Sequence, residues 1–302
     1  MTVLSTNQTG TVVVIGVFDG VHKGHQLLLN HAREIADGRA IVALTFDPHP
    51  THIFAPDRAP TLLTTLADRI ELLKIHNADQ VAVLKFNEKF AAMSPDDFVA
   101  NVLVAQLHVS TVVVGKNFSY GHKAAGGVET LKREGANHGF TVEVHELEVF
   151  SGGVVSSSRI RSLVTEGDVE TARKLLSRPH RLDGVVVHGE ARGREIGYPT
   201  ANLGNIEGQT IPAEGVYAGW LTVGINRWPA AISIGTNPTF AGERTRQVEA
   251  YALDQVGLDL YEQNAAIEFG WRLRPTLKFD GLEPLLVQMK LDCDQARQLT
   301  ET

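Results

Sequence analysis

The first half of the chain alternates short apolar runs with amphipathic stretches. Residues 12–15 form an uninterrupted apolar run, which is typical of a buried strand, and residues 26–36 have helical spacing with Leu27, Leu28 and Ile35 facing inward. The same pattern predicts further strands at residues 40–46, 80–85 and 110–114, and helices at residues 66–76 and 96–107. Strands that alternate with helices indicate a parallel sheet covered by helices on both faces.

The pattern changes near residue 180. Short alternating runs punctuated by Gly and Pro follow, which is typical of a small antiparallel β-barrel. Its strands are predicted at residues 182–188, 215–223, 227–234, 247–253 and 265–273. Residues 282–299 have the spacing of an amphipathic helix that closes the barrel. We therefore expect two domains, an α/β domain at residues 1–179 and a β domain at residues 180–302.

Composition narrows the class of protein. The chain has 302 residues, of which 43% are hydrophobic and 21% charged, enough for two globular domains. The net charge of −7 argues against nucleic acid or an anionic membrane as the main partner. The single cysteine, Cys293, excludes an intrachain disulfide and a multi-cysteine metal site. The polar N-terminus and the lack of a long apolar run predict a cytoplasmic protein.

The segment between the first strand and its helix carries the first candidate chemistry. Gly16, Gly20 and Gly24 lie there with two histidines, His22 and His25. A strand that turns through glycines into a helix directs backbone N–H groups and the positive end of the helix dipole at one spot. A lone histidine near a helix start is more often a cap or a surface residue, but this pair among glycines is far more restrictive. The segment predicts a nucleotide-handling site.

Two more loops follow predicted strands, at residues 47–50 and 115–117, and share the rim of the sheet with the histidines. Phe54 and Tyr120 are candidates for stacking on a flat heteroaromatic ring, and Asn117 for reading its polar edge. Pro48 and Pro50 make the first of these loops rigid. The alternative for two neighbouring aromatic residues, Phe46 and Phe118, is that they belong to the core.

Phosphate-binding features recur at two later places. Ser156, Ser157 and Ser158 precede Arg161 at the start of a helix, where they offer hydroxyl donors and a fixed positive charge. In the second domain, three glycines permit close approach of the backbone to a phosphate, namely Gly189, Gly193 and Gly197. Thr200 and Asn202 point to the same side of an extended segment and offer hard oxygen ligands suited to magnesium.

These segments resemble two known signatures. Residues 16–25, Gly-Val-Phe-Asp-Gly-Val-His-Lys-Gly-His, resemble the signature of the flavin-nucleotide branch of the nucleotidylyltransferases. Residues 155–161 resemble the Ile-Ser-Ser-Thr-x-x-Arg motif of the same family, with Val155 and Ser158 in place of Ile and Thr. Residues 192–203, with their Pro-Thr-Ala-Asn core, closely resemble the riboflavin kinase motif. Nearly the whole chain thus resembles the bacterial bifunctional riboflavin kinase/FMN adenylyltransferase family.

The resemblance implies a Rossmann-like first domain that adenylylates FMN and a barrel that phosphorylates riboflavin. Its ligands would be riboflavin, FMN, FAD, ATP, ADP and pyrophosphate, with ATP as co-substrate and Mg²⁺ as cofactor. It implies catalytic roles for His22, His25 and Arg161, and places Glu249 as the base of the kinase. The implied nucleotide-binding residues are Gly16, Phe18, Asp19, Gly24, Ser157, Ser158, Gly189, Arg194 and Gly197. The implied flavin-binding residues are Pro48, Pro50, Phe54, Asn117 and Tyr120, and the metal ligands are Thr200 and Asn202.

Two alternatives stay open at this point. One is a nucleotidylyltransferase acting on a pantetheine or nicotinamide nucleotide, against which the kinase motif counts. The other is a flavin-binding or storage protein without activity, against which His22, His25 and Glu249 count. The sequence is compatible with a weak homo-oligomer and does not set the oligomeric state.

Overall fold

The structure is a computed structural model that describes residues 10–189, 197–238 and 244–301. Its backbone groups into two compact units. The first comprises Met1–Pro60 and Thr65–Ser157, and the second comprises Thr61–Thr64 and Ser158–Thr302.

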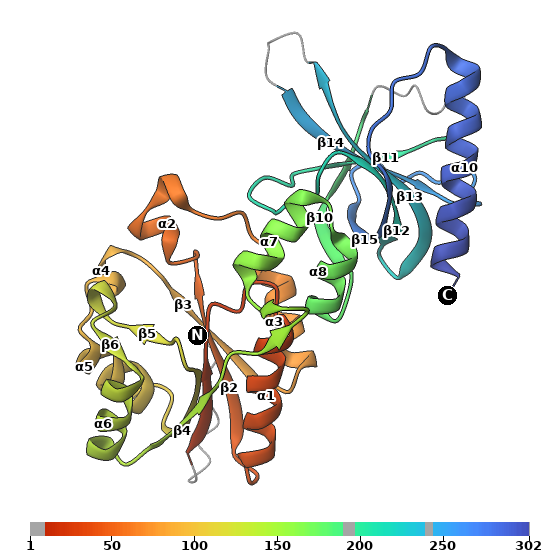
Figure 1. Ribbon diagram of the computed structural model, residues 1–302. Helices are drawn as coiled ribbons and strands as arrows, with labels where there is room; N and C mark the ends of the chain where they lie inside the picture. Colours follow the sequence, from red (N-terminus) through yellow and green to blue (C-terminus); the bar gives the residue numbers. More distant parts are fainter. Residues whose placement is uncertain (1–9, 190–196, 239–243, 302) are drawn as a thin grey trace. The chain divides into compact units, whose positions relative to one another are not determined.

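A parallel sheet forms the centre of the first unit (Figure 1). Its strands are β1 (Thr11–Ile15), β2 (Ala40–Asp47), β3 (Gln80–Lys85), β4 (Val109–Gly115) and β7 (Thr141–His145). They pair in the order β3-β2-β1-β4-β7, and every pair is parallel. The predicted parallel sheet is confirmed, and β7 is a strand that the apolar pattern did not predict.

Each face of this sheet has its own apolar core, because β1 is central and alternates its side chains between the two faces. Val12 and Val14 pack with helices α1 (Lys23–Ile35) and α3 (Leu66–Ile75). Val13 and Ile15 lie on the opposite face and pack with η2 (Phe98–Val104), a π-helix that continues α5 (Pro95–Asp97), and with α6 (Val128–His138). The predicted arrangement of helices on both faces is confirmed.

Helix α1 differs in detail from its prediction. It begins at Lys23, and its buried residues are Leu28, Leu29 and Ala32, whereas Leu27 is 44% exposed. The prediction that Leu27 faces inward is wrong, because the stripe that contacts the sheet is centred on the Leu28–Ala32 row, four residues apart. The remaining short elements of this unit are α2 (Thr51–Phe54), η1 (Pro56–Arg58), α4 (Glu88–Ala91), β5 (Ser119–Tyr120), η3 (His122–Ala124), β6 (Gly126–Gly127), β8 (Val149–Phe150) and β9 (Gly153–Val154).

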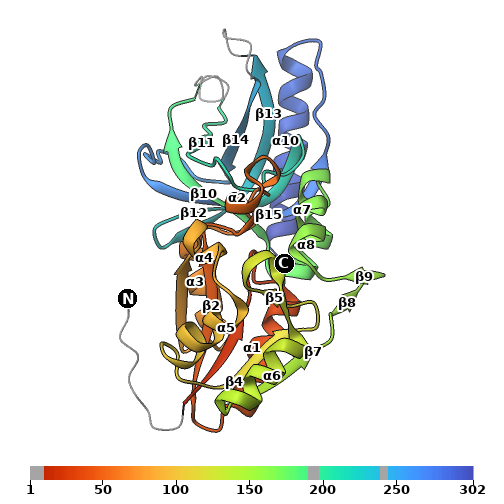
Figure 2. The ribbon, with the colours of Figure 1, turned by 90° about the vertical axis from the view of Figure 1, so that its left-hand side faces the viewer.

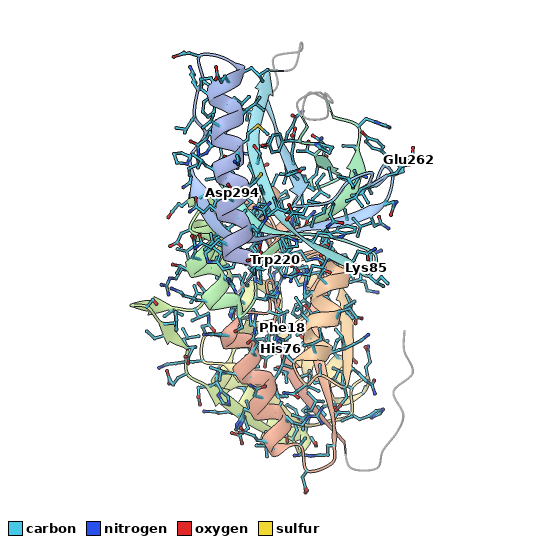
Figure 3. All side chains as sticks on the ribbon, turned by 90° about the vertical axis from the view of Figure 1, so that its right-hand side faces the viewer. Phe18, His76, Lys85, Trp220, Glu262 and Asp294 are labelled. Atoms are coloured by element: carbon cyan, nitrogen blue, oxygen red, sulfur yellow. The ribbon has the colours of Figure 1, made fainter. Side chains whose placement is uncertain are left out.

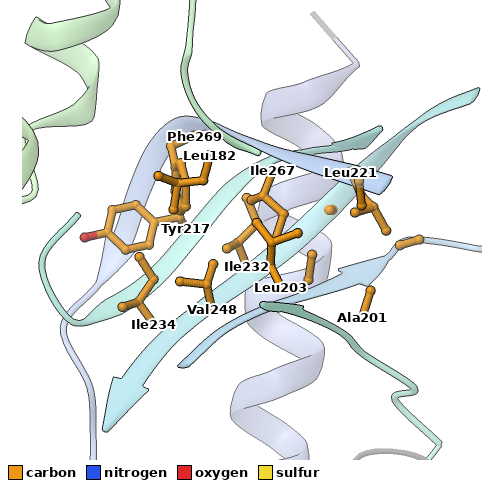
Figure 4. Close-up of a cluster of buried hydrophobic side chains, with 14 of the residues drawn as sticks. Leu182, Ala201, Leu203, Tyr217, Leu221, Ile232, Ile234, Val248, Ile267 and Phe269 are labelled. Atoms are coloured by element: carbon orange, nitrogen blue, oxygen red, sulfur yellow. The ribbon is translucent and has the colours of Figure 1, made fainter. Parts of the chain in front are cut away.

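The second unit contains a closed antiparallel barrel, as predicted. Its strands are β10 (His180–Val187), β11 (Ala201–Gly204), β12 (Gly215–Val223), β13 (Asn226–Pro238), β14 (Arg244–Ala252) and β15 (Asn264–Arg274), in the order β10-β11-β14-β13-β12-β15. Only the short β11 was not predicted. Figure 4 shows the barrel core, in which Tyr217, Ile232, Ile267 and Phe269 are fully buried.

Helices cover the barrel from outside. Figure 2 shows helix α10 (Leu282–Thr300) beside the barrel strands. Cys293 and Ala296 of this helix form an apolar cluster with Ala218 of β12. In Figure 3, Asp294 marks this helix and Trp220 marks β12. Two shorter helices, α7 (Ser157–Glu166) and α8 (Val169–Leu176), precede the barrel in the chain.

Two segments from before residue 180 belong to the second unit. Val169 of α8 is part of the barrel core. The tetrapeptide Thr61–Thr64 also belongs here, since Leu62 forms a parallel bridge with Gln209. No helix among the described residues is long and apolar enough to cross a membrane.

Candidate active sites

The two histidines of the first motif lie together at the start of α1. His22 occupies the N-cap position, and its carbonyl accepts a hydrogen bond from the His25 N–H at 2.8 Å. The two imidazole rings stack with their centroids 3.6 Å apart and their planes 16° apart. The structure therefore brings this predicted pair to the N-terminus of α1, the positive end of the helix dipole, which favours a phosphate.

The loop that carries the histidines has an unusual backbone. Phe18 and Val21 adopt positive φ angles of 55° and 39°, which are uncommon for residues with a side chain. Phe18, labelled in Figure 3, is fully buried, and its ring makes an edge-to-face contact with the His25 ring, with the centroids 5.1 Å apart. A Cβ atom at Gly16 would come within 2.9 Å of the Phe18 ring, and one at Gly24 within 3.3 Å of the His22 ring. These two glycines thus make room for the rings that shape the site.

His25 is held in its uncharged form. Its pKa lies well below the usual range, first because of burial, then because of His22, and then because of the positive charge of Arg69. A neutral imidazole carries one N–H donor and one acceptor nitrogen. At neutral pH His25 can therefore donate one hydrogen bond to a phosphate oxygen without itself changing charge.

Arg69 of α3 is a functional candidate that the sequence reasoning missed. Its side chain is fully buried, and Nη1 donates to the carbonyls of Val17 at 3.2 Å and Phe46 at 3.0 Å. A third contact reaches the Thr45 hydroxyl at 3.4 Å. The signal available in the sequence was its spacing: Arg69 lies four residues before Leu73, the other buried residue of this helix, and so on its inward stripe.

The predicted flavin loop follows β2. Pro48 and Pro50 lie between β2 and α2, and Pro50 is the N-cap of that helix. Phe54 is 56% exposed, and its ring edge contacts Phe86 at 5.3 Å between centroids. An exposed aromatic ring beside this loop is available to a flat ligand.

The two flavin candidates after β4 differ in exposure. Asn117 is exposed in the turn that follows β4. Tyr120 is only 7% exposed and stacks on Phe118, with centroids 5.5 Å apart. Burial raises the pKa of Tyr120 to about 12, with Glu134 and Asp96 as further causes. Phe118 therefore covers one face of the Tyr120 ring, which agrees with the alternative that Phe118 belongs to the core.

The serine cluster divides between the two units. Ser157 donates its hydroxyl to the carbonyl of Asp19 at 2.8 Å, and the Asp19 side chain is 1% exposed. Ser158 and Arg161 belong to α7 in the second unit, where Arg161 Nη2 donates to Ser158 Oγ at 3.3 Å. Ser157 thus fixes the backbone of the histidine loop directly.

In the barrel, three predicted residues share one face of the sheet. Asn202 of β11 pairs directly with Glu249 of β14, so their side chains lie on the same side. Thr200, two residues before Asn202, donates its hydroxyl to Glu249 Oε2 at 3.2 Å. Their neighbours Ala201 and Ala250 belong to the apolar core, so the polar face is the outer one.

Glycines shape this second site as well. A Cβ atom at Gly189 would collide with the side-chain amide of Asn202, so a larger residue there would displace that amide. Gly197 has a φ of +87°, which favours glycine. Arg194, the third predicted nucleotide ligand of this domain, lies outside the described residues.

The donor set of the barrel site fits magnesium. The Thr200 hydroxyl and the Asn202 amide oxygen are hard oxygen ligands of the kind that Mg²⁺ prefers, and the carboxylate of Glu249 lies beside them. Among the described residues no group of three or more His, Cys, Asp and Glu side chains is placed to hold a metal ion.

Comparisons with known proteins match both units. The FAD synthetase family model matches residues 4–159 and the riboflavin kinase model matches residues 176–300. A bifunctional riboflavin kinase/FMN adenylyltransferase of Listeria monocytogenes is 38% identical over 95% of this chain and 91% of the relative. The protein of the same name from Escherichia coli K12 is 35% identical over 96% and 93%. The predicted order of the two domains is confirmed.

A solved structure extends this agreement to the whole fold. A crystal structure described as a macrolide-efflux protein from Streptococcus pneumoniae superposes with a TM-score of 0.87 and 32% identity, covering 97% of this chain and 95% of that one. The predicted fold class and the predicted class of enzyme, a bifunctional transferase of flavin cofactor biosynthesis, are both confirmed. The chain belongs to the family of bifunctional riboflavin kinase/FMN adenylyltransferases.

Proposed function

We propose that the histidine site of the first unit transfers the adenylyl group of ATP to FMN, and that the outer face of β11 and β14 phosphorylates riboflavin. The observation that supports this assignment is that the stacked His22–His25 pair lies within the stretch matched by the FAD synthetase model, and the Thr200–Glu249 contact within the stretch matched by the riboflavin kinase model. The division of activities near residue 180 is part of the proposal.

In the first site, a phosphate oxygen of FMN attacks the α-phosphorus of ATP in line. The bond from that phosphorus to the β-phosphate oxygen breaks, which yields FAD and pyrophosphate. No protein nucleophile is needed, so the residues contribute positioning and charge stabilisation. His22 and His25 donate to the phosphates, and the helix N-terminus at Lys23 adds its dipole.

The other residues of this site bind the two ends of the reactants. Ser157, Ser158 and Arg161 hold the leaving pyrophosphate, and the loop of Gly16, Phe18, Asp19 and Gly24 shapes the nucleotide site. The flavin is held by Pro48, Pro50, Phe54, Asn117 and Tyr120. Of these, Phe54 has the largest exposed ring described above and is the expected stacking partner, while Tyr120 supports Phe118 from the core.

In the second site, Glu249 accepts the proton of the terminal hydroxyl of riboflavin, and the resulting oxygen attacks the γ-phosphorus of ATP. The bond to ADP breaks and FMN is released. Thr200 and Asn202 would hold Mg²⁺, which neutralises charge on the ATP phosphates. The Thr200 hydrogen bond orients the carboxylate of Glu249, and Gly189, Arg194 and Gly197 bind the nucleotide phosphates.

The setting of the enzyme is also a proposal. Both reactions consume ATP, and Cys293, the single cysteine, is buried as a free thiol, which suits the cytoplasm. Weak self-association is a further expectation, which sedimentation at several protein concentrations would test.

The assignment is tested by following products over time. The purified chain is supplied with riboflavin, ATP and Mg²⁺, and flavins are separated by chromatography. FMN should form first and FAD second, with pyrophosphate released in the second step only, and a chelator should stop both. Absence of FMN from riboflavin would refute the barrel assignment, and absence of FAD from supplied FMN would refute the other.

A further inference from the structure

We propose that Arg69 is a positioning residue for adenylyl transfer, whose guanidinium fixes the distance between the histidine loop and the flavin loop. The proposal rests on the assignment of the His22–His25 site to that reaction. It concerns a residue of α3 that lies in neither loop and in none of the motifs described above.

The contacts of Arg69 reach both loops from one nitrogen. Nη1 donates to the carbonyl of Val17 at 3.2 Å, just before Phe18 and the histidines, and to the carbonyl of Phe46 at 3.0 Å, just before Asp47 and Pro48. The Thr45 hydroxyl closes the network by donating to the same Val17 carbonyl at 2.9 Å. The segments leaving β1 and β2 are therefore joined through a single charged group.

The charges around Arg69 have the same two-loop arrangement. Asp19 of the histidine loop and Asp47 of the flavin loop both act on the guanidinium and oppose the effect of burial, which lowers its pKa. The chain after β1 thus contributes the Val17 carbonyl and the charge of Asp19, and the end of β2 contributes the Phe46 carbonyl and the charge of Asp47. Attraction to a common charge favours the arrangement in which both loops are close to α3.

Packing alone does not account for an arginine here. The side chain is fully buried beside Leu73, and Nε and Nη2 have no hydrogen-bond partner among the described residues. Burying a charged group with unmade hydrogen bonds costs free energy, and an apolar residue of similar size would fill this stripe at lower cost. The arginine therefore serves the loops rather than the core.

The reaction explains why the separation of these loops matters. In-line transfer needs the attacking oxygen of FMN about 3–3.5 Å from the α-phosphorus, and a displacement of about 1 Å can lower the rate roughly 100-fold. ATP phosphates and FMN are held by different loops, so the distance between the loops sets the distance between the reactants. Loss of the clamp should lower kcat more than it raises either KM.

The charge of Arg69 also has a consequence for pH dependence. His25 faces the His22 ring, the edge of Phe18 and, from α3, the charge of Arg69. Removing that charge raises the pKa of His25, so His25 becomes protonated at higher pH. The acid limb of the adenylylation rate should then move to higher pH in Arg69→Met but not in Arg69→Lys, which keeps the charge.

A matched control exists at the opposite end of the strands of the same sheet. Arg39, directly before β2, donates to the hydroxyls of Ser110 and Thr111 at 2.9 Å each and to the carbonyl of Ile35. It joins strand starts, as Arg69 joins strand ends. Arg39→Met therefore removes a similar clamp of the same unit at a distance from the proposed site.

The experiment compares Arg69→Lys, Arg69→Met and Arg39→Met in the full chain, with riboflavin phosphorylation by the same molecules as the measure of intact protein. We expect the kcat of FMN adenylylation to fall roughly 10- to 100-fold in both Arg69 variants, with KM values within about threefold, and to stay within about twofold in Arg39→Met. If Arg69→Met does not fold, the kcat of FMN adenylylation in Arg69→Lys tests the proposal by itself.

Two results would overturn the proposal: an Arg69→Lys enzyme with kcat within about twofold of the original, or an equal loss in Arg39→Met. The variant His22→Ala/His25→Ala separates this from failure of the site assignment. If that double variant kept its adenylylation rate, the assignment of the histidine site to adenylyl transfer would be wrong. If the double variant lost this rate while Arg69→Lys kept it, only the proposed role of Arg69 would be wrong.

Discussion

The two sites of this chain are built by opposite means. The histidine site consists of segments that leave the ends of parallel strands, with positive φ angles at Phe18 and Val21 and a buried cation beneath them. The barrel site consists of residues on paired strands, where register alone places Asn202 opposite Glu249. The first arrangement depends on distant contacts, and the second depends on alternation along the chain, so the two should respond differently to substitution.

The largest effect is expected from His22→Ala/His25→Ala. One donor to a developing charge is worth about 10²–10³ in rate, so loss of both should lower FAD formation by at least about 10⁴-fold. Riboflavin phosphorylation should stay near its original rate, because Glu249 and its neighbours are unchanged. Rates of both reactions measured on one preparation check this. Adenylylation within about tenfold of the original would contradict the proposed role of the pair.

Glu249→Gln tests the barrel site in the same way. The amide keeps the shape but removes the basic oxygen, so the kinase kcat should fall by roughly 10²–10⁴. Riboflavin and ADP affinity should change little, since the lost interaction acts mainly in the transition state. FAD synthesis from supplied FMN is the internal control. A defect confined to riboflavin binding would remove Glu249 from catalysis.

Gly189→Ala tests whether Asn202 is a ligand of Mg²⁺. The new Cβ collides with the Asn202 amide, so the Mg²⁺ concentration that gives half-maximal kinase rate should rise about tenfold or more. Gly127→Ala is the matched control, because its Cβ would have no described atom within 4 Å. Magnesium titrations of the two variants give the answer. Equal magnesium dependence would show that Asn202 is not a ligand.

The smallest effect concerns acid stability of the barrel. His180 is 1% exposed, burial lowers its pKa to about 4, and its Nε2 lies 2.7 Å from the Thr210 carbonyl. The unfolded chain binds a proton at His180 more readily than the folded chain does. The free energy of unfolding should therefore keep its full value above about pH 6.5 and fall by about 3 kcal/mol as the pH falls toward 4.

The test uses the three tryptophans, Trp220, Trp228 and Trp271, all of which lie on barrel strands. Urea unfolding followed by tryptophan fluorescence at pH 7 and pH 4.5 should show a weaker pH dependence in His180→Gln than in the original chain. His188→Gln, at an exposed position, should behave like the original. If the free energy of unfolding changed equally with pH in all three proteins, His180 would not be the group responsible for the loss of stability in acid.

The contrast between the sites also explains what the sequence could predict. Thr200 and Asn202 could be placed on one side because an extended segment alternates with a period of two. The pairing of Asn202 with Glu249 comes from the structure alone. The histidine pair could be placed because a glycine-rich strand-to-helix turn has a local signature. Helical spacing could have placed Arg69 on the inward stripe of its helix, but not its contacts, because its partners Val17 and Phe46 lie 52 and 23 residues away. The short strand β11 was missed because four residues carry too little periodicity.

The segment Thr61–Thr64 is synthesised well before the barrel residues that it contacts. Thr61 and Thr210, whose hydroxyls lie 3.0 Å apart, are separated by 149 positions in the chain. At the usual pace of translation the ribosome makes the later residue about 10–30 s after the earlier one. During that interval the tetrapeptide has no barrel to join, although the chain on either side of it already belongs to the first unit. The nascent protein must therefore keep this short stretch accessible until its second half has emerged.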